Sequence, residues 1–526
     1  MGIPSYYKTL CDRVPGLLSK VRKGQQPTHL WIDFNCMVYH CLRRPGAIAY
    51  PGEEGRVAWE DQLIRDVCNY VRKVVGLVGP TQQVFIGVDG VVPMAKLRQQ
   101  RLRRFKSHWT AAEEMRIGKR EVGAERWDTN AITPGTAFME RLGTALKGLS
   151  GNGPSGSGLQ WIVSGAEEPG EGEHKAMMML RVCKERDSHV IYGLDADLIV
   201  LSLLQPVKEL WLFREAVECG EVQYRDNEEE YRYFSIHKLR EVLSSGDDDY
   251  MRDYCMAMSF LGNDFLPHSF TFKLKDGGHH ELVDMLRDVR RSIGGPLTTA
   301  DGWKEVGIRK CLEWLAQREE DWMQRHCKGK LGKRWQHTRG SSPVEHAVDE
   351  WNKMPLRAAD ELALVTKVTK EECVLKESWR DVYWDRYMNG ATAADRTRAC
   401  EEYLRGLDWI FKYYMGEAVD REWCFPWYTT PLWADLASVA AASSTFPKAQ
   451  KPSNWQLAPQ QQLALVLPIE SYTLIRDTKL RRLPHLAAHL WPSDFQLFTG
   501  GRAQTWECEA LLPLFTMSRL RTLLAQ

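Results

Sequence analysis

The chain has 526 residues, of which 44% are hydrophobic and 26% are charged, an ordinary globular composition that excludes a disordered or fibrous protein. Lys and Arg together number 70 and Asp and Glu 69, so the formal net charge is +1. That balance excludes a globally basic protein that wraps nucleic acid, but it leaves room for local basic patches. The length predicts more than one domain.

The 13 cysteines form no CxxC pair, which argues against a structural zinc site, and a chain this long rarely depends on disulfides. No stretch reaches the roughly 18 apolar residues of a membrane span. The opening MGIPSYYKTLCDR lacks the apolar run of a signal peptide, and Tyr6 stands where a myristoylation signal needs Ser or Thr. We therefore expect an intracellular protein without a membrane anchor, with the cytoplasm favoured over the nucleus.

The first 215 residues alternate short apolar runs with helical patterns. Such runs, rich in β-branched and aromatic residues and separated by helices, predict buried parallel strands in an α/β domain, although single runs could be buried helix segments. The predicted strands are His29–Asp33, Val84–Asp89, Gln160–Ser164, His189–Asp195 and Glu209–Phe213.

Other segments carry weaker signals. Thr133 and Pro134 predict a helix start, with Phe138, Leu142 and Leu146 on its apolar stripe. The GNGPSGSG stretch at 151–158 predicts a flexible loop. Beyond residue 280 the pattern becomes mostly helical, for example in Trp303–Arg318 and Arg398–Tyr414, whereas the basic stretch Lys328–Arg339 predicts a solvated loop or a nucleic-acid contact.

Acidic residues close the predicted strands or follow them. They are Asp33, Asp89, Glu171, Glu173, Asp195 and Asp197, and a later segment, FLGNDFLPH, adds Asp264. Because the carboxyl ends of parallel strands meet at one edge of the sheet, where ligands bind, these side chains could converge. Each acid alone has a plainer reading: Asp33 or Asp89 could cap a helix, and the neighbouring Glu167 and Glu168 are read as surface charge.

So many carboxylates cannot stay ionised in one pocket without cations. Oxygen ligands favour Mg²⁺ or Mn²⁺ over Zn²⁺. Two such ions are the usual machinery for attack on a phosphodiester. The sequence therefore predicts a two-metal phosphodiesterase.

A basic stretch follows Asp89 directly, with six basic residues and no acid between Lys96 and Lys106. On a helix, Lys96, Gln100, Arg103 and Arg104 share one face and predict an anion pocket, while Arg98 and Arg101 point elsewhere, toward backbone phosphate or solvent. The alternative is a plain solvated basic face. Beside a metal site, such a pocket would select a terminal monophosphate over an internal diester.

The chain resembles the Xrn-type 5′→3′ exoribonucleases over nearly its whole length. The matching motifs are DGVVPMAKLRQQRLRRFKS, WDTNAITPGTAFMERL, PGEGEHK, YGLDADLI, GNDFLPH, YLRGLDWIFKYYMGEAVDREWCFPWYTTPLWADL and WPSDFQLFTGGRAQTWECEALLPLF, together with the opening MGIPSYYK. The resemblance implies a PIN-like, flap-nuclease-like α/β core at 1–285 and a mostly helical region at 286–526 that encloses the active site.

The same resemblance assigns roles to residues of this chain. It implies Mg²⁺-dependent two-metal hydrolysis, with Mn²⁺ as a possible substitute, at Asp33, Asp89, Glu171, Glu173, Asp195, Asp197 and Asp264. It implies that Lys96, Gln100, Arg103 and Arg104 bind the 5′-phosphate of single-stranded RNA. Asn35 would position backbone or a metal water, and Trp423, rather than Trp427, would pack beside the first nucleotides, although core packing is the alternative for Trp423.

The chain departs from the family pattern at several positions. Tyr39 stands where the family usually has a His that stacks on a base, and His40 follows it, so either ring could take that role. Cys36 replaces a Gly and Met94 an Arg. The extra C-terminal domains of the large cytoplasmic members are missing from this sequence.

Two other functions compete with a processive exoribonuclease. A 5′→3′ DNA exonuclease or flap endonuclease commonly carries a Gly-Ile-x-Gly hairpin after its last metal Asp, but here FLPHSF follows Asp264. A catalytically inert scaffold that binds RNA ends would not need all seven carboxylates, and all seven are present.

Overall fold

The computed structural model describes residues 6–22, 24–121, 126–149, 158–193, 195–218, 221–244, 246–334, 337–369, 371–390, 392–443, 445–453 and 455–525. The first five residues and nearly all of the loop predicted at 151–158 lie outside this set. The chain forms two compact units that interleave along the sequence. The first unit is Met1–Pro93, Glu125–Met251 and Trp455–Leu483; the second is Met94–Ala124, Arg252–Asn454 and Pro484–Gln526. This division differs from the predicted boundary after residue 285.

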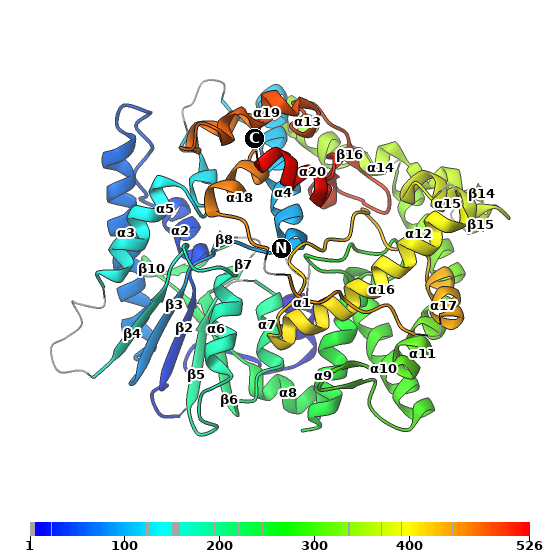
Figure 1. Cartoon of the computed structure of the whole chain (residues 1–526), viewed down its shortest axis with the longest axis horizontal. Helices are drawn as coiled ribbons and strands as arrows, with labels where there is room; N and C mark the ends of the chain where they lie inside the picture. Colours follow the sequence, from blue (N-terminus) through cyan, green and yellow to red (C-terminus); the bar gives the residue numbers. More distant parts are fainter. Residues whose placement is uncertain are drawn as a thin grey trace. The chain divides into compact units, whose positions relative to one another are not determined.

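A seven-stranded sheet with the order β1-β11-β6-β5-β2-β3-β4 forms the centre of the first unit (Figure 1). The strands are β1 (Leu18–Ser19), β2 (His29–Asp33), β3 (Gln83–Gly87), β4 (Gln160–Ser164), β5 (Ser188–Tyr192), β6 (Glu209–Glu215) and β11 (Tyr231–Ser235). All five predicted strands are present and parallel to one another, but β3 ends at Gly87 and β5 at Tyr192, before the predicted ends at Asp89 and Asp195. β11 and β1 add an antiparallel edge that the sequence analysis missed.

Helices on one face of this sheet build the main core. They are α2 (Asn35–Arg43), α3 (Arg56–Val78) and α5 (Ala137–Lys147), and their apolar side chains pack with Leu30, Ile32, Val84, Ile86 and Val190 of the strands. Alternate strand residues such as Trp31, Phe85 and Ile191 are equally buried. The central strands are thus covered on both faces, which explains why their sequences are continuous apolar runs rather than alternating ones.

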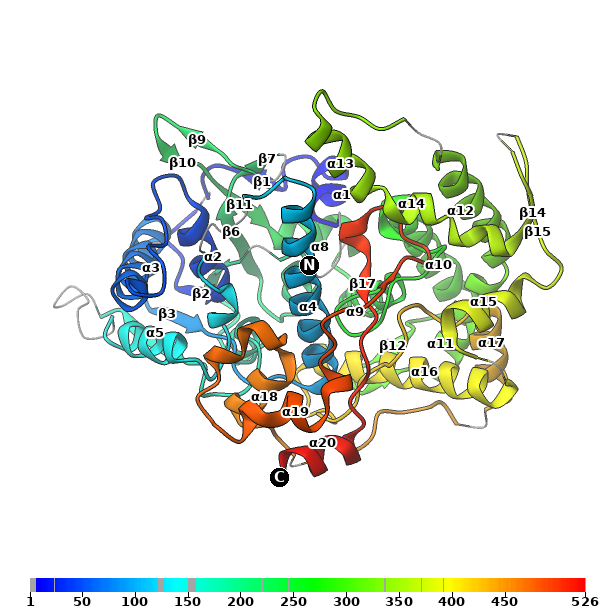
Figure 2. The same cartoon turned by 90° about the horizontal axis from the view of Figure 1, so that it is seen from above.

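The first unit has further α-helices among the described residues. They are α1 (Tyr6–Arg13), α6 (Gly172–Leu180), α7 (Asp197–Leu203), α8 (Ile236–Ser244) and α18 (Pro459–Val466). Of these, α6 packs against β2 and β3, and α8 packs against β6. Two short hairpins complete the unit: β7 (Val217–Glu218) with β8 (Glu221–Val222), and β9 (Tyr224–Arg225) with β10 (Glu228–Glu229), the latter extending beyond the main sheet in Figure 2.

Helix α5 begins three residues later than predicted. Its N-cap is Thr136, whose hydroxyl oxygen accepts a hydrogen bond from the backbone N–H of Met139. Gly135 adopts a left-handed φ of 94°, which separates Thr133 and Pro134 from the helix. The predicted apolar stripe of Phe138, Leu142 and Leu146 is buried as expected.

We expect Thr136→Ala to lower the free energy of unfolding by about 1 kcal/mol, because an N-cap hydrogen bond would be lost. Urea unfolding followed by circular dichroism measures this. Thr144→Ala, on an exposed part of the same helix, is the control, since Thr144 only donates to the Glu140 carbonyl. An effect of Thr136→Ala no larger than that of the control would contradict the assigned cap.

A late segment of the chain, Trp455–Leu483, closes the first unit. The side-chain oxygen of Gln462 accepts from the Val92 N–H at 2.9 Å, and Asn130 donates to the Ser471 hydroxyl at 2.9 Å. Leu474 packs against the main core. Residues far apart in sequence are therefore needed to complete this unit.

The second unit is mostly helical with short hairpins. Its helices are α4 (Met94–Arg116), α10 (Gly278–Ile293), α11 (Glu305–Ala316), α12 (Glu319–Lys333), α13 (Pro343–Asn352), α14 (Met354–Ala358), α15 (Trp379–Met388), α16 (Ala393–Met415), α17 (Trp433–Ala442) and α20 (Met517–Leu524). Two more, α9 (Asp248–Ala257) and α19 (Leu483–Leu486), each include residues of both units. Its hairpins are β12 (Thr298–Thr299) with β13 (Gly302–Trp303), β14 (Val365–Val368) with β15 (Cys373–Leu375), and β16 (Leu497–Phe498) with β17 (Glu509–Ala510). The helices predicted in Trp303–Arg318 and Arg398–Tyr414 are confirmed as α11 and α16, and α17 packs on both (Figure 2).

The predicted basic loop at Lys328–Arg339 is wrong for its first half, because Lys328–Lys333 form the last turns of α12. Lys330 is buried there and forms an ion pair with Glu361, which is itself fully buried. Glu361 also accepts from the Gly501 N–H at 2.7 Å. A lysine read as solvated is thus part of an internal ion pair.

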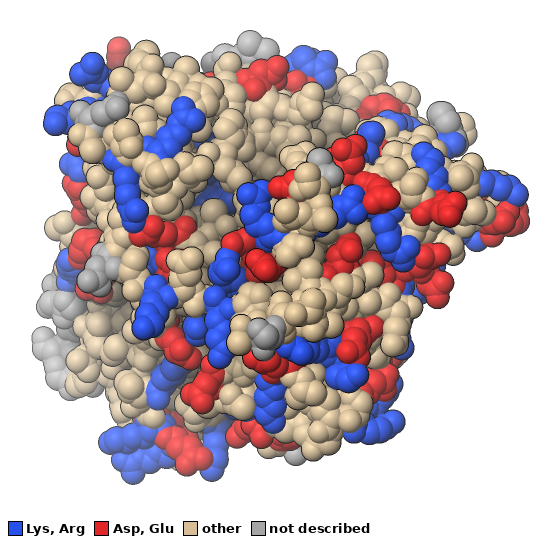
Figure 3. Space-filling model, turned by 45° about the vertical axis from the view of Figure 1, so that its right-hand side comes forward, with Lys and Arg blue, Asp and Glu red and all other residues tan. Residues whose placement is uncertain are grey.

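Among the described residues, no helix is long and apolar enough to cross a membrane. On the face drawn in Figure 3, Lys and Arg are interspersed with Asp and Glu. The near-neutral charge balance of the sequence is reflected in this mixed surface.

Candidate active site

The acids of the first unit stand at the carboxyl edge of the parallel strands. Asp33 is the last residue of β2 and pairs in register with Gly87, the last residue of β3. Asp89 follows β3 by two residues, and Glu171 immediately precedes α6, on the connection from β4. Asp195 and Asp197 follow β5, and Asp197 begins α7. The topology therefore places these residues where an open parallel sheet binds its ligands.

Two glycines allow the start of α6 to approach β3. A Cβ atom on Gly172 would lie 2.3 Å from the Gly87 carbonyl oxygen, and one on Gly87 would lie 2.4 Å from that of Gly172. Because of this close approach, the Gly172 N–H donates to Asp89 Oδ1 at 2.8 Å. The small residues of GEGE are needed for backbone contact here.

Asp89 is held from a second side by Asn35. The Asn35 amide donates to Asp89 Oδ2 at 2.9 Å, while its oxygen lies 3.5 Å from the Asp89 N–H. Asn35 begins α2, directly after β2. It therefore holds both the main chain and the carboxylate of Asp89.

Four other acids lie close enough to Asp33 to act on it electrostatically. Burial raises the pKa of the Asp33 carboxyl well above its ordinary value, and the negative charges of neighbouring carboxylates raise it further. These neighbours are Asp89, Asp195, Asp197 and Glu171. An anionic Asp33 in this setting needs a cation, and oxygen donors of this kind suit a hard divalent ion.

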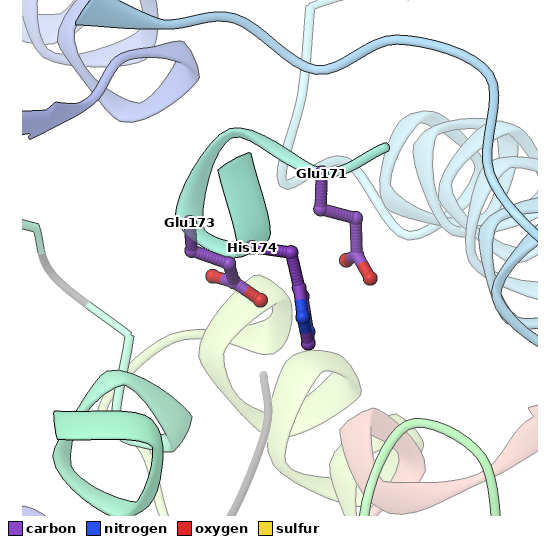
Figure 4. A group of neighbouring side chains, drawn as sticks. All are labelled: Glu171, Glu173 and His174. Carbon is purple, nitrogen blue, oxygen red and sulfur yellow. The ribbon is translucent and has the colours of Figure 1, made fainter. Parts of the chain in front are cut away.

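Glu173 lies beside Glu171 at the start of α6. Glu171, Glu173 and His174 offer ligand atoms that all lie within 4.8 Å of one another, and Figure 4 shows the three side chains extending to the same side of the helix start. Glu171 and Glu173 are buried, whereas His174 is partly buried. The donor set therefore fits a metal ion, with carboxylates as its main ligands.

The four residues predicted to form an anion pocket lie on α4, in the second unit. Lys96 donates to Asp264 Oδ2 at 2.7 Å, Arg103 is exposed, and Gln100 and Arg104 are largely buried. Although burial opposes ionisation, Lys96 lowers the pKa of Asp264 to about 2. Among the residues that the structure describes, the side-chain oxygen of Gln100 is buried without a hydrogen-bond partner.

Two family models match the chain. One, described as "XRN 5'-3' exonuclease N-terminus", covers residues 1–216, and the other, "Xrn1 helical domain", covers residues 367–526. The chain is 26% identical to human 5'-3' exoribonuclease 1, over 99% of its own length and 34% of that protein. It is 24% identical to the 5'-3' exoribonuclease 2 homolog of Drosophila melanogaster and to 5'-3' exoribonuclease 2 of Gallus gallus, spanning 70% of each.

The chain belongs to the Xrn family of 5′-3′ exoribonucleases. It spans about a third of the human relative and over two thirds of the other two. Nucleases of the Xrn family are metal-dependent, and the carboxylate cluster of the first unit is the candidate metal site. Asp264 belongs to the second unit.

Two residues of the Xrn motif PGEGEHK were missed as site residues. His174 lies beside the two glutamates, as described above. Lys175 donates to the carbonyl oxygens of Val88 at 2.8 Å and Gly165 at 2.9 Å, which ties the ends of β3 and β4 together next to Asp89. Their place directly after GEGE, at a helix start, was the available signal, but the bonds of Lys175 depend on the folded sheet.

His40 is not an available stacking residue. It is largely buried, its Nε2 lies 2.8 Å from Glu229 Oε1, and its ring stacks on Tyr70 with centroids 4.5 Å apart. Burial disfavours the ionised Glu229, but hydrogen bonds from His40, Lys73 and Tyr231 lower its pKa to about 2. Tyr39 is partly buried against the core, with the Arg43 guanidinium 5.5 Å from its ring centroid.

The aromatic residues near REWCFPWY are packed inside the second unit. Trp423 is only 7% exposed, donates to Glu402 at 3.0 Å and lies 5.3 Å from Trp409 between ring centroids. Trp427 donates to the Met388 carbonyl at 2.9 Å. The core-packing alternative is therefore the better description of Trp423.

Arg98 and Arg101 have structural partners instead of the phosphate or solvent contacts predicted for them. Arg98 donates to the Pro426 carbonyl at 3.2 Å and lies over the Tyr428 ring. Arg101 is buried, donates to the Leu490 carbonyl and lies 4.4 Å from the Phe105 ring centroid. Both guanidinium groups fasten α4 to its own unit.

Proposed function

We propose that this protein is a processive, metal-dependent 5′→3′ exoribonuclease that degrades 5′-monophosphorylated single-stranded RNA to mononucleotides. The observation that carries the proposal is the crowding of Asp33 by four other carboxylates at the edge of a parallel sheet. Family membership supports it, since the relatives are named 5'-3' exoribonucleases. The resemblance adds a PIN-like assignment of the sheet.

The proposed metal ligands of the first unit are Asp33, Asp89, Glu171, Glu173, Asp195 and Asp197. The resemblance also assigns a metal ion to Asp264, which belongs to the second unit. Mg²⁺ is the expected ion, because all of these donors are carboxylate oxygens. Bound divalent ions would supply Lewis-acid stabilisation of charge on the phosphodiester oxygens. Asn35, Gly172 and Lys175 would hold Asp89 and its strand end in place for this chemistry.

The proposed 5′-phosphate pocket is the face of α4 with Lys96, Gln100, Arg103 and Arg104. A terminal monophosphate carries more charge than an internal diester, so several cationic donors on one face favour it. Gripping the end in this way would restrict cleavage to the first linkages of the RNA.

One RNA body with three ends tests the proposal. RNAs with a 5′-monophosphate, a 5′-hydroxyl or a 5′-triphosphate are incubated with the protein and Mg²⁺, alongside a chelator control and a 5′-phosphorylated DNA of the same sequence. We expect rapid release of mononucleotides from the monophosphorylated RNA alone. Equally fast DNA cleavage or internal fragments would favour the flap-nuclease function, and binding without cleavage would favour the inert scaffold.

Arg103→Ala combined with Arg104→Ala should reduce the preference for a 5′-phosphate about tenfold or more, because charge-assisted phosphate contacts are lost, while cleavage of 5′-hydroxyl RNA changes less. Rates on the two substrates measure this preference. The matched control removes Arg287 and Arg291, two exposed arginines of α10 in the same unit. Equal losses on both substrates would count against a dedicated end pocket.

A further inference from the structure

One lysine of the proposed phosphate pocket is already bound to an anion of the chain. Lys96 Nζ lies 2.7 Å from Asp264 Oδ2, and only 14% of the Lys96 side chain and 11% of the Asp264 side chain are exposed. Arg103 is near enough to act electrostatically on the same carboxylate. Asp264 therefore sits among the cations that are proposed to hold a terminal phosphate.

In this arrangement the Asp264 carboxylate competes with a bound 5′-phosphate for the Lys96 ammonium. A lysine ammonium engaged at 2.7 Å with a shielded carboxylate must give up or share that bond to reach a phosphate oxygen. Both residues of this contact belong to the second unit.

We propose that the Asp264 carboxylate is the resident counter-ion of the 5′-phosphate pocket and sets the pocket's affinity by competing with the phosphate for Lys96. This inference rests on the proposed function, which assigns Lys96 to the phosphate and Asp264 to a divalent ion. An ion that engages Asp264 releases Lys96, so metal and 5′-phosphate bind cooperatively and each strengthens the other by the same factor. End recognition is thereby made dependent on metal.

The metal-free test uses adenosine 5′-monophosphate, which has no internal linkage to cleave, with adenosine as the reference. Isothermal titration calorimetry on the full chain in chelator gives both affinities. We expect Asp264→Asn to tighten binding of the monophosphate about tenfold and to leave adenosine unchanged. Asp276→Asn, which removes an exposed acid of the same unit, should have no effect.

Placing Asp264→Asn in a Lys96→Met background separates competition from general repulsion. If the gain passes through Lys96, it disappears in this background, whereas a gain that persists would overturn the proposal in favour of simple charge removal. Thermal unfolding checks that each variant is folded. If Asp264→Asn does not fold, Asp264→Ser is used in its place.

A second arm adds Mg²⁺. It should strengthen binding of the monophosphate by the wild type and not by Asp264→Asn, and equal strengthening in both would overturn the coupling. If the wild type prefers the monophosphate to adenosine, but Asp264→Asn binds the monophosphate no more tightly than the wild type does, this inference is overturned and the proposed end pocket is not. A wild type without that preference would overturn the proposed end pocket and this inference with it.

Discussion

Glu173→Gln should lower the turnover of 5′-phosphorylated RNA by about 10²–10³-fold or more. Glu173 is buried at the start of α6, and its carboxylate lies within 4.8 Å of the ligand atoms of Glu171 and His174. The substitution keeps the size of the side chain and removes its charge, so the loss would reflect metal ligation rather than packing. Removing one preorganised charged group from a catalytic centre has effects of this order.

Single-turnover rates with Mg²⁺ in excess measure this effect, and calorimetric titration with Mn²⁺ reports the metal affinity independently. The control is Glu167→Gln, an acid on the same connection that forms a surface ion pair with Lys147. Its turnover should stay within about twofold of wild type, because exposed pairs contribute little. Unchanged turnover in Glu173→Gln would contradict the assigned site.

Glu361→Gln should lower the free energy of unfolding by about 3 kcal/mol. The Lys330 side chain is buried beside Glu361, so removal of the carboxylate charge leaves a buried ammonium without its counter-ion. The double change Glu361→Leu with Lys330→Met should cost less than Glu361→Gln, because no buried charge remains. Urea unfolding measures both, and a double variant less stable than the single one would contradict this reasoning.

The same ion pair predicts a pH dependence. Burial disfavours the Glu361 carboxylate, but His326 and Lys330 lower its pKa to about 2, below the ordinary value of 4.5. The stability it contributes is therefore present above about pH 4.5 and is lost as the pH falls toward 2. Between about pH 5 and pH 3, Glu361→Gln should lose less stability than wild type. Glu372→Gln, in an exposed pair with Lys367, should follow the wild type.

The sequence was informative where a local pattern determines structure. Buried parallel strands read as continuous apolar runs, and acids that follow them reach one edge by topology, so five strands and the clustered acids were predictable. The basic face of α4 followed from helical spacing. The strands and the helical face are determined by residues that are close together in the sequence.

Features set by distant partners were not predictable. His40 has an aromatic ring of the kind that can stack on a base, but Glu229 and Tyr70 enclose this ring. Trp423 is similarly enclosed by Glu402 and Trp409. Lys330 looked solvated because Glu361, its partner, lies 31 residues later. In each case the decisive contact joins segments whose proximity appears only in the folded chain.

The interleaving of the two units has a consequence for protein synthesis. A growing chain emerges from the ribosome N-terminus first, and domains usually fold as they are completed. The sheet that bears the acids has all its strands by Ser235, but the segment that closes its unit ends at Leu483. The chain must therefore be translated through Leu483 before this unit can close. The sheet and its acids are made early, but they are held in a complete unit only after the second unit's Arg252–Asn454 segment has also been synthesised.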